Sequence, residues 1–279
     1  MKVQLPLSLT KQLKKWDKQN PFTKRQQFVG VTLLLTAMLM LTQLVSFDYR
    51  YPMIALLAIS SYGLCAFALR EDLKKHEWFT LLALPTGFTM AVALFYFLLP
   101  TRWLTRLPIA TLYAVGMYAL LLTENIYNVA SVRTIALLRA AHSVGFLLTL
   151  TTYFLLVQTI LAYRFSGWTD ALLIGVVTFP LTMQLLWSMN LDGEVGKSVK
   201  DLSVSITAVL VELTWIVTFL PVRSTILALF LTTVFYGLSG LGQQYLADRL
   251  YKKTVIEFFS VVAIVSTIFI LTLNWRPGI

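Results

Sequence analysis

Continuous apolar runs, separated by short polar segments, follow one another along almost the whole chain. Such runs occur at residues 28–45, 53–69, 79–99, 107–123, 143–163, 170–189, 202–220, 225–242 and 254–274. A helix needs about 20 apolar residues to cross the hydrocarbon core of a bilayer, and a backbone in lipid must satisfy its own hydrogen bonds. The pattern therefore predicts an all-α polytopic transmembrane helical bundle of nine spans, within a range of eight to ten.

The composition points to the same class of protein. Hydrophobic residues make up 57% of the chain and charged residues only 13%. A soluble domain carries about 25% charged residues, so this chain lacks the polar side chains that would coat a water-facing surface. Nearly all of its length is taken up by the apolar runs.

The distribution of the 23 lysines and arginines predicts the orientation of the spans. Seventeen of them fall in the first 27 residues and in every second loop after that, whereas six fall in the remaining loops and the C-terminus. Cytoplasmic loops of membrane proteins carry an excess of Lys and Arg. We therefore expect a multi-pass protein of the cytoplasmic membrane, with the N-terminus inside and the C-terminus outside.

Residues 1–27 form a basic segment that precedes the transmembrane domain of residues 28–279. Leu9, Leu13 and Trp16 recur with helical spacing, and lysines occupy the other faces: Lys11, Lys14, Lys15 and Lys18. This pattern predicts an amphipathic cytoplasmic helix that lies on the bilayer and binds anionic lipids through its lysines. The alternative is a basic tail that only sets the topology. We expect no nucleic-acid partner.

The segment from Thr123 to His142 is the least lipid-like stretch after the N-terminus. It is too polar to span and too apolar for a solvated loop, so we expect a helix that lies partly at the cytoplasmic interface or re-enters the bundle. This segment resembles uncharacterised polytopic bacterial membrane proteins. The resemblance implies a membrane protein and carries no activity with it.

Glu212 lies near the middle of the seventh run, where we expect it close to the centre of the bilayer. An ionisable residue inside a membrane span is a functional hypothesis by default, because its burial is costly. Glu212 is therefore our candidate for binding a substrate or ion. The alternative is a carboxyl group that joins two helices through a hydrogen bond.

A second polar group is expected at the cytoplasmic ends of the spans. Glu124 and Asn128 follow the fourth run, Arg139 and His142 precede the fifth, and Glu257 opens the ninth. Because consecutive spans alternate in direction, these residues reach similar depths. We expect them to line a polar route to Glu212, with Arg139 as the partner of Glu124 or Glu257; the alternative is ordinary interfacial polarity.

Other catalytic chemistry finds little support. The chain has one cysteine and two histidines, so we expect no metal site and no cofactor. The sequence Gly237-Leu-Ser-Gly240 resembles the nucleophile motif of rhomboid proteases. Such a serine needs a histidine base, which rhomboids carry on a later span, and the ninth run contains none. The glycines are better explained as small residues that let two helices approach closely.

Three functions remain open from the sequence. The first is a small permease-like protein that moves a small solute or ion. The second is a membrane scaffold or accessory subunit of an envelope or lipid-handling complex. The third is a membrane-embedded enzyme that modifies a lipid, with Glu124, Arg139 and His142 as its acid–base and phosphate-holding groups. Because no catalytic set is complete, we favour the two non-enzymatic functions.

Overall fold

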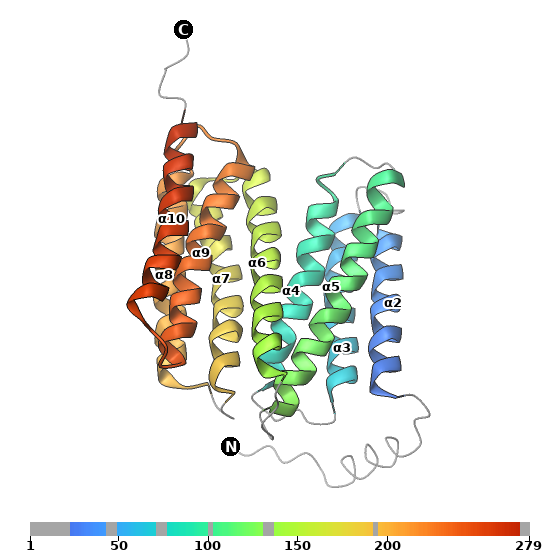
Figure 1. Ribbon diagram of the computed structural model, residues 1–279. Coiled ribbons are helices and arrows are strands. Elements are labelled where there is room, and N and C mark those ends of the chain that lie inside the picture. The colour runs from blue at the N-terminus through green and yellow to red at the C-terminus, as the bar shows by residue number, and fades with distance from the viewer. Residues whose placement is uncertain are drawn as a thin grey trace, which may run out of the picture.

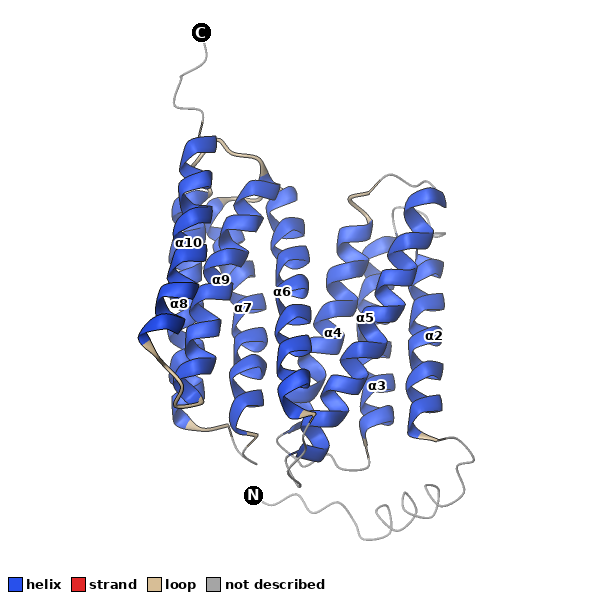
Figure 2. Ribbon diagram, viewed as in Figure 1, coloured by secondary structure: helices blue, strands red, loops and turns tan. Residues whose placement is uncertain are grey.

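The computed structural model describes residues 23–42, 49–70, 77–99, 103–130, 137–191 and 195–273. All regular structure in these ranges is α-helical (Figures 1 and 2). Nine helices are described: α2 (Lys24–Thr42), α3 (Arg50–Leu69), α4 (Glu77–Tyr96), α5 (Trp103–Ala130), α6 (Leu138–Ala162), α7 (Gly167–Asn190), α8 (Lys197–Val217), α9 (Ser224–Leu246) and α10 (Lys252–Thr272).

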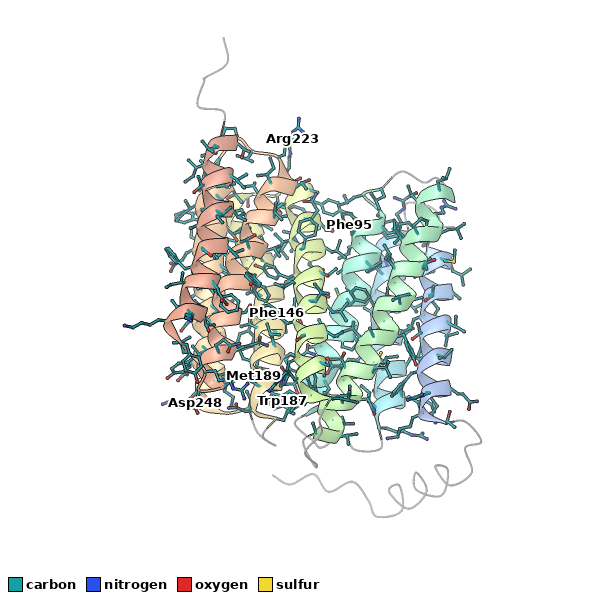
Figure 3. The ribbon with its side chains drawn as sticks, viewed as in Figure 1. Phe95, Phe146, Trp187, Met189, Arg223 and Asp248 are labelled. Carbon is teal, nitrogen blue, oxygen red and sulfur yellow. The ribbon has the colours of Figure 1, made fainter. Side chains whose placement is uncertain are left out.

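Consecutive helices run in opposite directions through the bundle (Figure 1). At one end, which we call the basic end, α2, α4, α6, α8 and α10 begin; Lys24, Lys197 and Lys252 start three of these helices. At the opposite end, the far end, α3, α5, α7 and α9 begin. Figure 3 shows Asp248 at the basic end and Arg223 at the far end.

Each predicted apolar run coincides with one helix, but the segment between the fourth and fifth runs is different. Residues 124–130 continue α5 to Ala130, so this part of the segment is helical as expected, but it extends the fourth span instead of forming a separate element. The reason is that Glu124 and Asn128, four residues apart, extend the buried face formed by Met117 and Leu121. The remainder of the segment lies partly outside the described residues.

Eight of the described helices are long and apolar enough to cross a membrane. The helix that does not meet this standard is α8, which nevertheless lies along α7 and also contacts α9. The first described helix begins at Lys24, slightly before the predicted run. The lysines expected to bind anionic lipids lie outside the described residues: Lys11, Lys14, Lys15 and Lys18.

The helices pack as two groups that meet along a junction. Helices α2–α5 contact one another, and helices α6–α10 do the same. The main contacts between the groups are made by α4 and α5 on one side and by α6 and α7 on the other. Residues that link these four helices therefore control how the two groups are held together.

Two prolines lie inside helices that face each other at this junction. Pro85 is in α4 and Pro180 is in α7. A Cβ atom added at Gly87 would lie 3.7 Å from Leu181, so the two proline-containing stretches are side by side. Proline removes a backbone hydrogen bond from a helix interior, which weakens the helix locally.

Glycines of α9 allow α10 to approach closely. A Cβ atom at Gly237 would lie 2.5 Å from Val262, and one at Gly240 would overlap the ring of Phe258. Ser239, between them, is buried and donates its hydroxyl hydrogen to the carbonyl oxygen of Phe235 in its own helix. The interpretation of this motif as a helix contact is therefore confirmed.

Candidate functional site

Glu124 is a fully buried acidic residue inside the bundle. It lies six residues before the end of α5, which places it about 9 Å inside the basic end of that helix. Its side chain is 0% exposed, and it faces the junction between the two helix groups. An ionised carboxylate in such a place is costly unless it is hydrogen-bonded or paired.

The side chain of Gln184 provides the hydrogen bond to this acid. Nε2 of Gln184 on α7 donates to Oε1 of Glu124 on α5 over 2.5 Å. Within the described part of the chain, Oε2 of Glu124 and Oε1 of Gln184 have no hydrogen-bond partner. The pair therefore joins the two groups, but each side chain retains unused hydrogen-bonding capacity.

Neighbouring residues on α5 fix the helix around this acid. Asn128 donates from Nδ2 to the carbonyl oxygen of Leu69 at the end of α3, over 3.1 Å. Tyr127 donates its hydroxyl hydrogen to the carbonyl oxygen of Ala141 on α6, over 2.9 Å. The first contact lies within the α2–α5 group, whereas the second crosses the junction.

His142 on α6 completes the polar cluster from the other side. Its Nε2 lies 2.8 Å from the carbonyl oxygen of Ser188 on α7. Because a carbonyl oxygen only accepts, Nε2 must carry the hydrogen. The imidazole also stacks on the ring of Tyr127 at a centroid distance of 5.6 Å. His142 therefore contacts Glu124 only through intermediate residues.

A small cavity lies beside this cluster. Its volume is about 10 Å³, and Tyr127, Gly145, Gln184 and Ser188 contribute to its lining. A cavity of this size holds at most a single water molecule. Three larger cavities, of about 560, 730 and 240 Å³, share no lining residue with this small one, and the expected polar route to Glu212 stays a prediction.

Only part of the predicted site is brought together by the fold. Glu124, Asn128 and His142 lie in the cluster described above. Arg139 is exposed at the basic end, and Glu257 is exposed on α10. Among the described residues, neither acid forms an ion pair with Arg139, so the expected partnership is not present.

Glu212 lies apart from this cluster, on an exposed face of α8. Its neighbour Val211 faces Gly175, which is eight residues into α7. Eight residues of helix rise about 12 Å, so Glu212 lies well inside the membrane-crossing part of the bundle. It points away from the packed core rather than toward Glu124.

The two groups also meet at the far end, through a pair of tyrosines. The hydroxyl of Tyr51 on α3 donates to that of Tyr163, which follows α6, over 3.5 Å. This hydrogen bond, together with partial burial, raises the pKa of Tyr163 to about 12. The Tyr163 hydroxyl therefore keeps its hydrogen near neutral pH.

Tyr127 and Ser188 belong to the cluster but do not stand out in the sequence. A tyrosine next to polar residues, or a serine near the end of a span, is common in membrane helices. Gly145 carries a clearer structural requirement, because a Cβ atom there would lie 2.5 Å from the Tyr127 hydroxyl. No signal in a single sequence separates this glycine from the others.

The length and apolar composition of eight of the described helices indicate a multi-pass α-helical membrane protein. The chain belongs to a family of proteins of unknown function (DUF5656), whose model matches residues 68–272. This match runs from the end of α3 through α10 and includes Glu124, Gln184 and His142. Comparison with curated proteins and with solved structures gives no match. The expected similarity to uncharacterised proteins is thus confirmed, whereas the resemblance to polytopic bacterial membrane proteins stays a prediction.

Proposed function

We propose that the protein is a small permease-like carrier in which Glu124 takes up and releases the coupling proton. One observation carries this proposal: Glu124 is fully buried at the junction of two helix groups, where its described contact is a single side-chain hydrogen bond, to Gln184. Acidic residues inside membrane proteins are rare and often mark ion and proton pathways. The coupling role that the sequence suggests for Glu212 passes to Glu124, because Glu212 faces outward.

The junction supplies the means to open a route to this acid. The proline-containing stretches of α4 and α7 contact each other there through Gly87 and Leu181, and kinked or broken helices recur in transporters. Separating the groups at the basic end would break the Glu124–Gln184 hydrogen bond. It would also admit water, which stabilises the ionised carboxylate. Closing the junction requires the proton, so proton binding and group movement are linked.

The substrate class that fits best is a small polar solute or an ion. The cluster offers amide, hydroxyl and imidazole groups, and its closed cavity of about 10 Å³ must widen to admit a solute. We further propose that the basic end faces the cytoplasm and that the protein resides in the cytoplasmic membrane, because Lys and Arg favour the inner side.

Proton movement in reconstituted vesicles tests the proposal. Purified protein is placed in liposomes that contain a pH-sensitive dye, and defined mixtures of sugars, amino acids, organic acids and inorganic ions are added outside. We expect at least one mixture to change the internal pH with the wild-type protein. The Glu124→Gln variant should abolish that change, since glutamine has the same shape but no titrating proton.

Glu257→Gln serves as the matched control, because Glu257 is an exposed acid on α10. It should behave like the wild type. The proposal is wrong if no mixture moves protons with the wild-type protein, or if Glu124→Gln retains the full response.

A second candidate, a scaffold or accessory subunit, is favoured by the exposed face of α8. Asp201, Ser205, Ala208 and Glu212 lie along this face at spacings of three and four residues, and all four are exposed. Small and polar residues at such spacings are typical of helix–helix contacts in membranes. The exposed residues of α10 include the bulky apolar side chains of Phe259 and Ile264, which suit lipid.

A further inference from the structure

A cavity of about 560 Å³ opens at the far end of the α6–α10 group. Its walls come from the end of α6, the start of α7, the end of α8 and the start of α9. Sites for small molecules typically enclose 300–1,000 Å³, so this space is large enough for a ligand. It shares no lining residue with the Glu124 cluster and is independent of the proposed transport function.

Asp170 is the buried charge in this cavity. It lies in the first turn of α7, lines the cavity and is only 3% exposed. Its Oδ1 atom accepts no hydrogen bond from the part of the chain that the structure describes. Placing the carboxylate at a helix N-terminus gives it some stabilisation. A buried carboxylate with an unused oxygen still favours a ligand that carries a cation or a strong donor.

Two arginines line the same cavity. Arg164 follows α6, and Arg223 is the residue just before α9. Both are exposed, and neither is within ion-pair distance of Asp170 in the described chain. Arg223 extends beyond the helix ends in Figure 3. Among the described residues, no side chain accepts a hydrogen bond from the first backbone N–H groups of α9, so these groups also favour an anion at this position. One ligand with separated positive and negative charges would satisfy all these groups.

An apolar groove of about 730 Å³ begins next to this cavity. Gly167 and Asp170 line the cavity, whereas Trp168 and Ala171 line the groove, so both spaces reach the first turns of α7. The groove follows α7 as far as Pro180. Twelve residues of helix rise about 18 Å, slightly more than half of the roughly 30 Å hydrocarbon core.

The aromatic pair at the start of α7 indicates where the membrane surface lies. Trp168 and the α8 residue Trp215 have ring centroids 4.7 Å apart. Tryptophan is enriched at the boundary between lipid and water. The charged cavity therefore lies at the level of lipid headgroups, and the groove lies at the level of the acyl chains of one leaflet.

We propose that the cavity and the groove together bind one phospholipid with a phosphoethanolamine headgroup. The ammonium group lies against Asp170, the phosphate lies between Arg164 and Arg223, and an acyl chain occupies the groove along α7. An amine that keeps its hydrogens donates to the carboxylate, which a fully methylated ammonium does not. The charged cavity thus recognises the headgroup, and the apolar groove recognises the acyl chain.

Lipid binding to the delipidated, full-length protein tests this site. Phosphatidylethanolamine, phosphatidylcholine and phosphatidylglycerol are added separately to the protein in detergent, and the bound lipid is counted by native mass spectrometry. We expect phosphatidylethanolamine to bind at least tenfold more tightly than the other two, since a charged hydrogen bond contributes about that factor. Equal binding of the three lipids would overturn the proposal.

Variants at Asp170 and Arg164 test separately what the negative and the positive side chains contribute to lipid binding. Asp170→Asn should lower the affinity for phosphatidylethanolamine roughly tenfold and leave that for phosphatidylglycerol unchanged. Arg164→Gln, at an exposed position, should weaken both lipids. Asp201→Asn and Arg249→Gln are matched controls at exposed positions on other loops and faces, and they should have no effect. If the controls weaken binding as much as the site variants, the assigned site is wrong.

The groove provides a test that does not depend on the buried aspartate. Val176 is exposed in the groove, so Val176→Trp fills it without disturbing the core. This variant should weaken phosphatidylethanolamine binding roughly tenfold. Free phosphoethanolamine, which has no acyl chain, should bind far more weakly than the lipid. Equal affinity for the free and lipid-attached group, or no effect of Val176→Trp, would overturn the lipid assignment.

Discussion

Gln184 of α7 donates a side-chain hydrogen bond to the buried carboxyl group of Glu124 on α5. The bond crosses the junction between the two helix groups and lies inside the bundle near its basic end. A hydrogen bond between helices in a membrane protein contributes only about 0.6 kcal/mol on average, with measured values up to about 2. In the proposed carrier, a bond of this strength would favour the closed junction and still break when the two helix groups separate.

The protonation of Glu124 is open to direct measurement. We expect infrared difference spectra between acidic and alkaline buffers to contain the C=O band of a protonated carboxyl group that titrates. The Glu124→Gln variant should lose that band, because its amide does not titrate. Glu257→Gln should retain it, and persistence of the same band in Glu124→Gln would exclude Glu124 as its source.

The packing of the polar cluster also depends on the absence of a Cβ atom at Gly145. A Cβ atom at this position would meet the hydroxyl of Tyr127, which is held by its hydrogen bond to Ala141. We expect Gly145→Ala to lower the free energy of unfolding by about 1–3 kcal/mol, since overpacking costs that much. Thermal unfolding in detergent measures the change.

Two controls identify the cause of this loss. Gly63 lies in α3, and a Cβ atom there would meet nothing within 4 Å. Gly63→Ala should therefore leave stability unchanged or raise it by up to about 1 kcal/mol. Combining Gly145→Ala with Tyr127→Phe, which removes the hydroxyl, should cost less than the two single changes added together. Additive costs would show that the clash with Tyr127 is not responsible.

Most of the fold follows from the apolar runs, because the need for about 20 apolar residues per span is a strong constraint. The end of the fourth span is an exception, because tertiary contacts around Glu124 decide where α5 ends. Taken alone, the polar residues after Thr123 indicate the end of a span. In the structure, Gln184 and the carbonyl oxygen of Leu69 satisfy two of those residues, so α5 continues to Ala130.

The site was only partly predictable for a related reason. Glu124 and Glu212 look similar in the sequence, since each is a single acid in or beside an apolar run. Which of them faces the core depends on how each helix is rotated against its neighbours. Asp170 gives even less signal, because an acid in the first turn of a helix is ordinary. Its burial becomes evident only when four helix ends are placed around one cavity.

The orientation of the bundle stays a prediction that surface labelling can test. In a Cys65→Ala background, Ser198→Cys introduces a thiol at the exposed basic end, and Ser166→Cys introduces one at the exposed far end. A membrane-impermeant maleimide added to intact cells should label position 166 and leave position 198 unlabelled until the cells are opened. The reverse pattern would show that the basic end faces outward.

The exposed face of α8 leads to a prediction about assembly. Glu212 is exposed at a depth where lipid chains would surround it, and Ala208 lies four residues away on the same face. A carboxyl group in hydrocarbon costs several kcal/mol, so another protein helix is expected to cover this face in the membrane. A photo-reactive side chain at position 208 should therefore form a cross-link to protein when cells are irradiated.

Position 264 on α10 provides the comparison for this experiment. Ile264 is also exposed, and Val261 and Ile268 next to it on α10 are exposed apolar side chains with no charged group among them, so a photo-reactive side chain there should react with lipid alone. Glu212→Leu should reduce the protein cross-link from position 208, because it removes the group that favours a polar partner over lipid. A protein cross-link from position 208 would support the role of a scaffold or accessory subunit. Reaction with lipid alone at both positions would instead leave α8 facing the bilayer and remove the main support for that role.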